Sequence, residues 1–272
     1  MNCGFWQSSC DGVRIRDEHL MPTRNPAEIQ EDEYAFPYHY VARYGTHGFG
    51  QTFHDSWGIS YASTIEFLLE RIAAARVSEI VDVGCGDGRF TRELALRGAK
   101  RVVGVDRSPR AIALARAMNH DLPALRFLEA DITAAWSEPP FEAAVLMEVL
   151  EHIPIDDAPA LVRAVRKLLR PGGRLFLTVP HRNTPLQAKH FRHFSVQTLS
   201  DALRSDFELC AVVPFERMGW RRSLLDTLLG NRIFLLNHAG ALNTLYRWYK
   251  RRLFHCRGEA ECRRIFVEAV AR

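Results

Sequence analysis

The chain has 272 residues, of which 47% are apolar and 25% are charged, and its formal net charge is +4. This length and composition favour one α/β domain with additions over two equal domains. The sequence has no stretch of about 18 apolar residues, and no basic segment followed by an apolar one at its N-terminus. We therefore expect a cytoplasmic protein with neither a membrane span nor a secretory signal. Its six cysteines form no C-x-x-C pair, which indicates reduced thiols.

The chain is expected to begin with an arm, residues 1–50, of which the first 33, rich in Asp, Glu, Asn and Pro, are predicted to be flexible. A helix is predicted over 56–76. From residue 79 on, strands and helices alternate, which is typical of an α/β fold with a parallel, doubly wound sheet. The expected strands are 79–83, 101–106, 125–130, 141–148, 173–180, 207–215 and 264–271, and the expected helices in this part are 89–98, 109–118, 157–169 and 196–205.

Three alternating glycines, Gly84, Gly86 and Gly88, follow the first of these strands and precede a helix. Glycine lets the backbone turn sharply and approach a ligand, and a helix start presents free amides and the positive end of its dipole. The spacing differs from the G-x-G-x-x-G of dinucleotide folds, because Arg89 stands where the third glycine would fall. Asp106 ends the second strand about 20 residues later, where a carboxylate can accept hydrogen bonds from a ribose diol.

Four motifs in this order, at 81–88, 105–106, 130–132 and 170–173, resemble those of class I S-adenosylmethionine-dependent methyltransferases. The resemblance covers roughly residues 51–205. It implies a Rossmann-like sheet of seven strands whose last two form an antiparallel pair at one edge. It also implies how the cofactor is bound. The glycines would leave room for its methionine part, Asp106 would hold its ribose, and Asp131 with Ile132 would contact its adenine. The cofactor-binding residues implied are Asp82, Gly84, Gly86, Asp106, Arg107, Asp131, Ile132 and Met147.

Glu148, Glu151 and His152 form an E-x-x-E-H cluster after the fourth strand. The cluster resembles that of ubiquinone-pathway O-methyltransferases and small-RNA terminal 2′-O-methyltransferases. In those families the acidic pair, the adjacent histidine and a later histidine hold a divalent metal at the substrate hydroxyl. His190 could supply the later histidine here, and magnesium, manganese, iron or zinc would suit such ligands. The alternative is that the Glu–His pair contacts the cofactor or caps a loop.

Glu148, His152 and His181 are the candidate catalytic residues. His181 follows the fifth strand and is a candidate general base, the alternative being a partly exposed loop histidine. Aromatic residues at 34–40 and 49–58 are expected to fold over the cofactor and close the acceptor site. Trp57 or Tyr61 could then face the cationic sulfur, unless these rings only fill space between the arm and the sheet.

The connection between the last two strands, residues 217–262, is expected to be a helical insert above the active site. Residues 217–264 carry 11 Lys or Arg against 3 Asp or Glu. The basic side chains could bind an anionic acceptor or contact an anionic membrane surface, or they could form a solvated face. The expected division is therefore an arm over 1–50, a cofactor-binding core over 51–216, the insert over 217–262 and a last core strand over 263–272.

The sequence thus predicts a methyltransferase that moves the methyl group of S-adenosylmethionine to an oxygen of a small-molecule or glycan-like acceptor. Two alternatives remain. An RNA 2′-O-methyltransferase would use the basic insert to follow phosphates, although no RNA-binding module is recognisable and nucleic acid is not the expected partner. A binding protein that kept the fold without the chemistry is the other.

Overall fold

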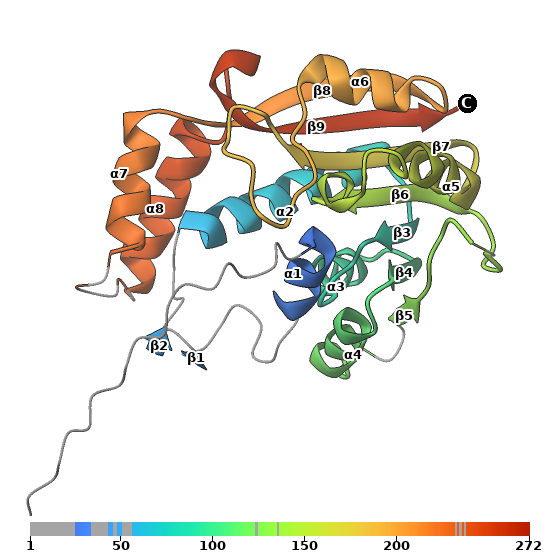
Figure 1. The fold of residues 1–272 in the computed structure, drawn as a ribbon, viewed down its shortest axis with the longest axis horizontal. Helices are drawn as coiled ribbons and strands as arrows, with labels where there is room; N and C mark the ends of the chain where they lie inside the picture. Colours follow the sequence, from blue (N-terminus) through green and yellow to red (C-terminus); the bar gives the residue numbers. More distant parts are fainter. Residues whose placement is uncertain are drawn as a thin grey trace, which may run out of the picture.

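The computed structural model describes residues 25–33, 43–45, 48–50 and 56–272, apart from 123–124, 135, 232, 234–235 and 237. At its centre is a seven-stranded sheet in the order β5-β4-β3-β6-β7-β9-β8 (Figure 1). Strands β3 to β7 pair in parallel, and β9 pairs antiparallel with both β7 and β8. The predicted α/β fold with an antiparallel pair at one edge is confirmed. The strands are β3 (Glu79–Val83), β4 (Arg101–Asp106), β5 (Arg126–Glu129), β6 (Phe141–Met147), β7 (Leu169–Pro180), β8 (Phe207–Arg217) and β9 (Cys262–Ala271).

Helices cover both faces of the sheet, because its strands alternate their apolar side chains between two core clusters. Val81 and Val83 face one cluster, which includes apolar residues of α5 and α6, whereas Ile80 faces the other, formed with α2, α3, α7 and α8. The helices are α1 (Pro26–Glu33), α2 (Ser56–Ala75), α3 (Arg89–Leu96), α4 (Pro109–Met118), α5 (Ala158–Leu168), α6 (Val196–Leu203), α7 (Trp220–Leu229) and α8 (Ala239–Arg252). Short elements complete the described chain: the 3₁₀ turns η1 (Leu150–His152) and η2 (Glu259–Glu261), and a small hairpin of β1 (Arg43–Gly45) with β2 (Gly48–Gly50).

Residues 26–33 form the helix α1, although the sequence predicted a flexible arm there. Asn25 caps the helix by accepting a hydrogen bond from the amide of Ala27 at 3.0 Å, and Pro26 occupies the first helical position. An isolated helix of this length is marginal in water, so contacts with the core decide whether it forms. One such contact joins Arg110 of α4 to Glu31, with Nε and Oε1 3.8 Å apart.

The insert begins at the carboxyl edge of the sheet. Because β9 is antiparallel to both of its neighbours, β8 runs parallel to β7 and ends at the same edge. Figure 1 shows α7 and α8 side by side beyond that edge. In the part of the chain that the structure describes, no helix is long and apolar enough to cross a membrane.

Candidate functional site

A cavity of about 740 Å³ opens at the carboxyl ends of β3, β4 and β6, a volume typical of small-molecule sites. Five of the eight predicted cofactor residues line it: Gly84, Asp106, Arg107, Asp131 and Ile132. The helix α1 also lines it, through Pro26, Ala27, Gln30 and Glu31. The sequence did not predict that contribution, since nothing in so short a segment indicates what it packs against.

The glycine turn below the cavity requires glycine for steric reasons. Gly84, Gly86 and Gly88 all have a positive φ, at 71°, 55° and 76°, a region that side chains disfavour. A Cβ atom on Gly84 would also lie 2.6 Å from Cγ2 of Val149. The turn therefore keeps its backbone against the cavity with no side chain in between.

Asp106 ties this turn to the end of β4. Its Oδ2 accepts a hydrogen bond from the amide of Gly86 at 3.1 Å, and its Oδ1 accepts one from the amide of Ser108 at 2.9 Å. Burial raises the pKa of this carboxyl, and the two amide bonds oppose the rise. Each carboxylate oxygen can accept more than one hydrogen bond, so Asp106 can hold the turn and still bind a ligand hydroxyl.

Three predicted cofactor residues, Asp82, Gly86 and Met147, are not among the described residues that line the cavity. The Asp82 carboxylate is buried and accepts a hydrogen bond from the Thr91 hydroxyl at 2.7 Å, and burial raises its pKa to about 7. This aspartate joins β3 to α3 behind the glycine turn. Met147 packs against the core cluster that contains α2.

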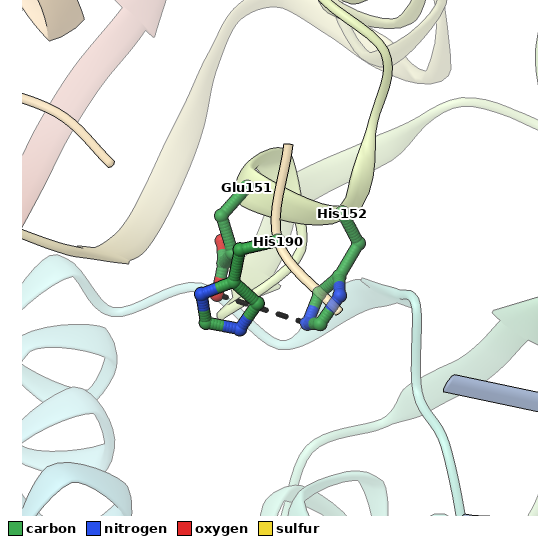
Figure 2. Close-up of side chains that lie close together, drawn as sticks. All are labelled: Glu151, His152 and His190. Carbon is green, nitrogen blue, oxygen red and sulfur yellow. Dashed lines mark ion pairs between the residues drawn. The ribbon is translucent and has the colours of Figure 1, made fainter. Parts of the chain in front are cut away.

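Glu151, His152 and His190 form a group with the chemistry of metal ligands. Each offers one ligand atom, and these three atoms lie within 4.8 Å of one another (Figure 2). Glu151 and His152 come from the turn η1 after β6, whereas His190 comes from the loop after β7. His152 also lines the cavity, so the group borders the same cavity as Gly84.

The hydrogen bonds of His190 determine which of its ring nitrogens carries the proton. The Thr184 hydroxyl donates to the carbonyl of His181 at 2.8 Å, and Nδ1 of His193 lies 3.1 Å from both oxygens of Thr184. Nδ1 of His193 must therefore be the donor, which leaves its Nε2 to accept from Nδ1 of His190 at 2.8 Å. Nε2 of His190 is left with a lone pair. Burial, together with the neighbouring histidines, lowers the pKa of His190 to about 3 and so keeps the ring neutral.

A hydrogen bond from Nδ1 also orients the ring of His152. Its Nδ1 lies 3.0 Å from the carbonyl oxygen of Lys189, so Nδ1 donates a hydrogen bond to that oxygen and Nε2 is the nitrogen that can coordinate a metal when the ring is neutral. That Nε2 lies 3.9 Å from Oε1 of Glu151. Among the described residues, both carboxylate oxygens of Glu151 are buried without a hydrogen-bond partner, and burial, reinforced by the nearby Glu148, raises its pKa well above the usual value.

Glu148 lies beside this group but outside it. Its backbone has a φ of 58°, unusual for a residue with a side chain, and its Oε2 accepts a hydrogen bond from Nε of Arg264 at 3.0 Å. Oε1 is buried without a partner among the described residues, and Glu148 lines the cavity. Arg264 also bonds Oε2 of Glu216 at 2.7 Å. The sequence could not identify Arg264, because it lies 116 residues away and belongs to a strand with ordinary patterning.

His181, the candidate general base, is held by contacts within the fold. Its side chain is buried, its Nδ1 accepts from the amide of Asn183 at 3.0 Å, and its Nε2 contacts Oε1 of Glu259 at 2.8 Å. It is not part of the described cavity lining. Both ring nitrogens thus have partners within the fold, and the burial of the side chain contradicts the alternative of an exposed loop histidine.

The insert does not line the described cavity either. Arg222, one of its predicted acceptor-binding arginines, is buried and bonds Glu216 at 2.6 Å and Asp226 at 2.8 Å. Lys250 pairs with Glu66 at 2.8 Å. These cations attach the insert to the core.

The predicted aromatic cover lies mostly outside the described residues, which omit 34–42, 46–47 and 51–55. Trp57 and Tyr61 are described, and their rings stack with centroids 4.9 Å apart. Neither ring is part of the described lining of the cavity.

Comparison with known proteins agrees with this geometry. Residues 80–173 match the family described as a methyltransferase domain. A ubiquinone biosynthesis O-methyltransferase of Xanthomonas axonopodis pv. citri is 35% identical over 123 residues, which are 43% of this chain and 49% of that protein. The chain spans about half the length of the curated relatives it matches.

Solved structures share the fold at low sequence identity. The N-methyltransferase NodS from Bradyrhizobium japonicum, in complex with S-adenosylhomocysteine, has a TM-score of 0.59 at 17% identity and covers 91% of this chain and 99% of its own. The [4+2]-cyclase SpnF has a TM-score of 0.54 at 17% identity and covers 76% of this chain and 80% of its own. The fold alone therefore does not determine the reaction. The matched family, the curated relatives and the fold together identify residues 80–173 as a class I S-adenosylmethionine-dependent methyltransferase domain.

Proposed function

We propose that this protein transfers the methyl group of S-adenosylmethionine to a hydroxyl oxygen of a small-molecule or glycan-like acceptor, with a divalent metal held beside the methyl group. The observation that carries this proposal is the group of Glu151, His152 and His190 at the border of the cavity formed by the glycine turn. A cofactor site and a metal-ligand group on neighbouring strand ends suit the methylation of a poorly acidic group.

The charge of the cavity supports a cationic cofactor. Its described lining holds five carboxylates against the single guanidinium of Arg107, and these are Glu31, Asp106, Asp131, Glu148 and Asp157. S-adenosylmethionine carries positive charge at its sulfonium and its amino group, so such a lining attracts it. Gly84 would leave room for the methionine part, and Asp106 would accept hydrogen bonds from the ribose.

The three metal-ligand side chains fit a cation as well. Nε2 of His190, Nε2 of His152 and the carboxylate of Glu151 lie together, and a buried carboxylate without a hydrogen-bond partner is costly unless something positive neutralises it. Glu148, predicted as a fourth ligand, has one oxygen bound to Arg264 and one buried without a partner among the described residues. We propose Glu151, His152 and His190 as the ligands, with Glu148 beside them at the acceptor.

A bound divalent cation would lower the pKa of a coordinated hydroxyl, which in water is a poor nucleophile. The chain's own residues supply the rest. The glycine turn and Asp106 would fix the cofactor, and α1 would exclude water from above. Alignment of the reacting atoms accounts for much of the rate of such a displacement. An amine acceptor would need no such activation, which is why the metal group favours oxygen.

Binding and turnover test the two parts of this proposal separately. Calorimetry with S-adenosylhomocysteine, and then with Mg²⁺, Mn²⁺, Fe²⁺ and Zn²⁺ one at a time, requires no acceptor. A screen of hydroxylated small molecules and sugars, read by product mass, then looks for methyl transfer. His152→Ala should abolish metal binding and reduce turnover while cofactor affinity stays within about twofold, with His120→Ala, at an exposed position in the turn after α4, as the control.

The possible outcomes are distinct. Absence of cofactor binding would refute the whole proposal and favour a protein that kept only the fold. Full turnover in chelator would refute the metal while leaving methyl transfer in place. Methylation of a terminal 2′-hydroxyl in a short RNA would favour the alternative RNA enzyme. The acidic cavity argues against RNA, and because no insert arginine lines the described cavity, we do not extend the proposal to an anionic acceptor.

A further inference from the structure

Exposed apolar side chains concentrate on one short segment of the insert. Ten large apolar residues in the described chain are exposed, and half of them lie between residues 218 and 233. Their exposed fractions are 38% for Met218, 71% for Trp220, 60% for Leu224, 38% for Leu228 and 93% for Ile233. Single exposed apolar residues are normal on any protein, but a cluster of this kind marks an interaction surface.

The spacing on α7 places three of these side chains on one face. Trp220, Leu224 and Leu228 follow one another at intervals of four residues, so they form a stripe along the helix. Another face of the helix is already occupied, because Leu225 and Leu229 are buried in the core cluster that includes α2. The helix therefore has an inner apolar face that packs on the core and an outer apolar stripe, Trp220–Leu224–Leu228, that faces solvent.

The two helices of the insert, α7 and α8, expose an excess of cationic side chains. The three acidic residues of the insert are engaged: Asp226 with Arg222, Glu261 with Arg217 and Glu259 with His181, each at 2.8 Å. Among the described residues no carboxylate pairs with four exposed arginines of α7 and α8, namely Arg221, Arg247, Arg251 and Arg252. The guanidinium of Arg221 lies over the ring of Trp220, 5.2 Å from its centroid.

We propose that α7, through the stripe Trp220–Leu224–Leu228 together with Ile233, seats the protein on an anionic lipid bilayer, with Arg221 beside the stripe at the lipid phosphates and the exposed arginines of α8 adding to the electrostatic attraction. An amphipathic helix with tryptophan and leucine on one face and arginine beside it lies in the interface of such a bilayer. Each basic residue near the surface strengthens binding by about fivefold. A second copy of this chain fits less well, because apposing two cationic surfaces is repulsive.

Co-sedimentation of the full chain with vesicles of phosphatidylcholine, with and without phosphatidylglycerol, tests this proposal. We expect binding to the anionic vesicles to exceed binding to the neutral ones by at least about tenfold, and to weaken as salt is added. The triple variant Trp220→Ser, Leu224→Ser, Leu228→Ser should lose at least about tenfold in binding, because its stripe no longer buries apolar area. Replacing Leu96 and Met118 with Ser, two exposed apolar residues elsewhere, is the matched control and should change nothing.

Two results would overturn the proposal. One is equal binding of the wild type and the stripe variant to anionic vesicles, or no binding by either. The other is a change of the stripe variant from dimer to monomer in sedimentation velocity without lipid, which would assign the surface to a second copy. Circular dichroism of the triple variant shows whether it folds, and the test needs neither cofactor nor acceptor. Its result is therefore independent of the proposed reaction.

Discussion

Replacing Glu151 with Gln should stabilise the metal-free protein, which is an unusual expectation for a residue proposed as a ligand. The side chain is 1% exposed and neither carboxylate oxygen has a hydrogen-bond partner among the described residues. An amide of the same shape removes the charge and keeps the packing. A buried polar group without a partner costs roughly 1–3 kcal/mol, and more when it is charged. The amide keeps the first cost and removes the second, so the gain at pH 8 should equal the additional cost of the buried charge.

The pH dependence of this gain follows from the raised pKa of Glu151. Because the folded-state pKa lies above the unfolded-state pKa, protonation stabilises the folded protein at low pH, and this contribution is lost as the pH rises through the folded-state pKa. The amide that replaces the carboxyl in Glu151→Gln does not titrate. The difference in stability between the variant and the wild type should thus be small near pH 4.5 and grow as the pH rises.

Thermal unfolding in chelator and in excess metal measures both effects. One kcal/mol corresponds to a shift of about 2–4 °C for a chain of this size. Metal at about 100 times its dissociation constant should stabilise the wild type by roughly 2.7 kcal/mol and Glu151→Gln far less, so adding metal should shift the difference in stability toward the wild type by up to about that amount. Glu129→Gln, at an exposed position, is the control. A Glu151→Gln variant that is less stable than the wild type in chelator at pH 8 would show that the carboxylate has a partner we have not recognised.

Three further predictions concern residues around the cavity. Asp106→Asn should weaken S-adenosylhomocysteine binding by roughly 1.5–3 kcal/mol in calorimetry, since the ribose loses a charged acceptor; unchanged affinity would remove Asp106 from the ribose site. His193→Ala should lower metal affinity about 10- to 100-fold, because His190 loses the partner that orients it, whereas an equal loss in His120→Ala would exclude that role. Gly84→Ala should destabilise the fold by at least about 1–2 kcal/mol in denaturant, owing to its positive φ and the contact with Val149, and a variant as stable as the wild type would contradict the turn geometry.

Local sequence patterns predicted the parts of this site that depend on neighbouring residues. Gly84 has a positive φ, which favours glycine on local grounds alone. Asp106 is the last residue of β4, so predicting the end of that strand also predicted its position. The strand order then brings the ends of β6 and β7 side by side, so His190 could be expected near His152.

The parts that were missed depend on contacts between distant segments. His193 matters only because the loop folds so that it faces His190, and the same sequence could have pointed it to solvent. His181 had the right position for a base, but Glu259, 78 residues away, engages it. For α1, the sequence of residues 26–33 has too few apolar residues to indicate what it covers, and its position over the cavity depends on tertiary contacts such as that of Arg110 with Glu31.

The buried network that holds Glu148 should make the protein sensitive to acid. Burial alone would raise the pKa of Glu216, but Arg264 and Arg222 lower it to about 2. A folded-state pKa below the usual 4.5 means that this carboxylate stabilises the fold above pH 4.5 and that its contribution is lost as the pH falls toward 2. The shift corresponds to roughly 3 kcal/mol.

Glu216→Gln should therefore destabilise the protein at pH 7 by roughly 3–5 kcal/mol, because two buried guanidinium groups lose their shared anion. Its stability should also depend less on pH between 4.5 and 2 than that of the wild type, and denaturant unfolding across this range measures both effects. Glu208→Gln, on the same strand and exposed, is the control. Parallel pH profiles for the wild type and Glu216→Gln would show that Glu216 is not the group that titrates. In that case the charge of Glu216 would not be what holds Arg222 of the insert and Arg264, the partner of Glu148, in place.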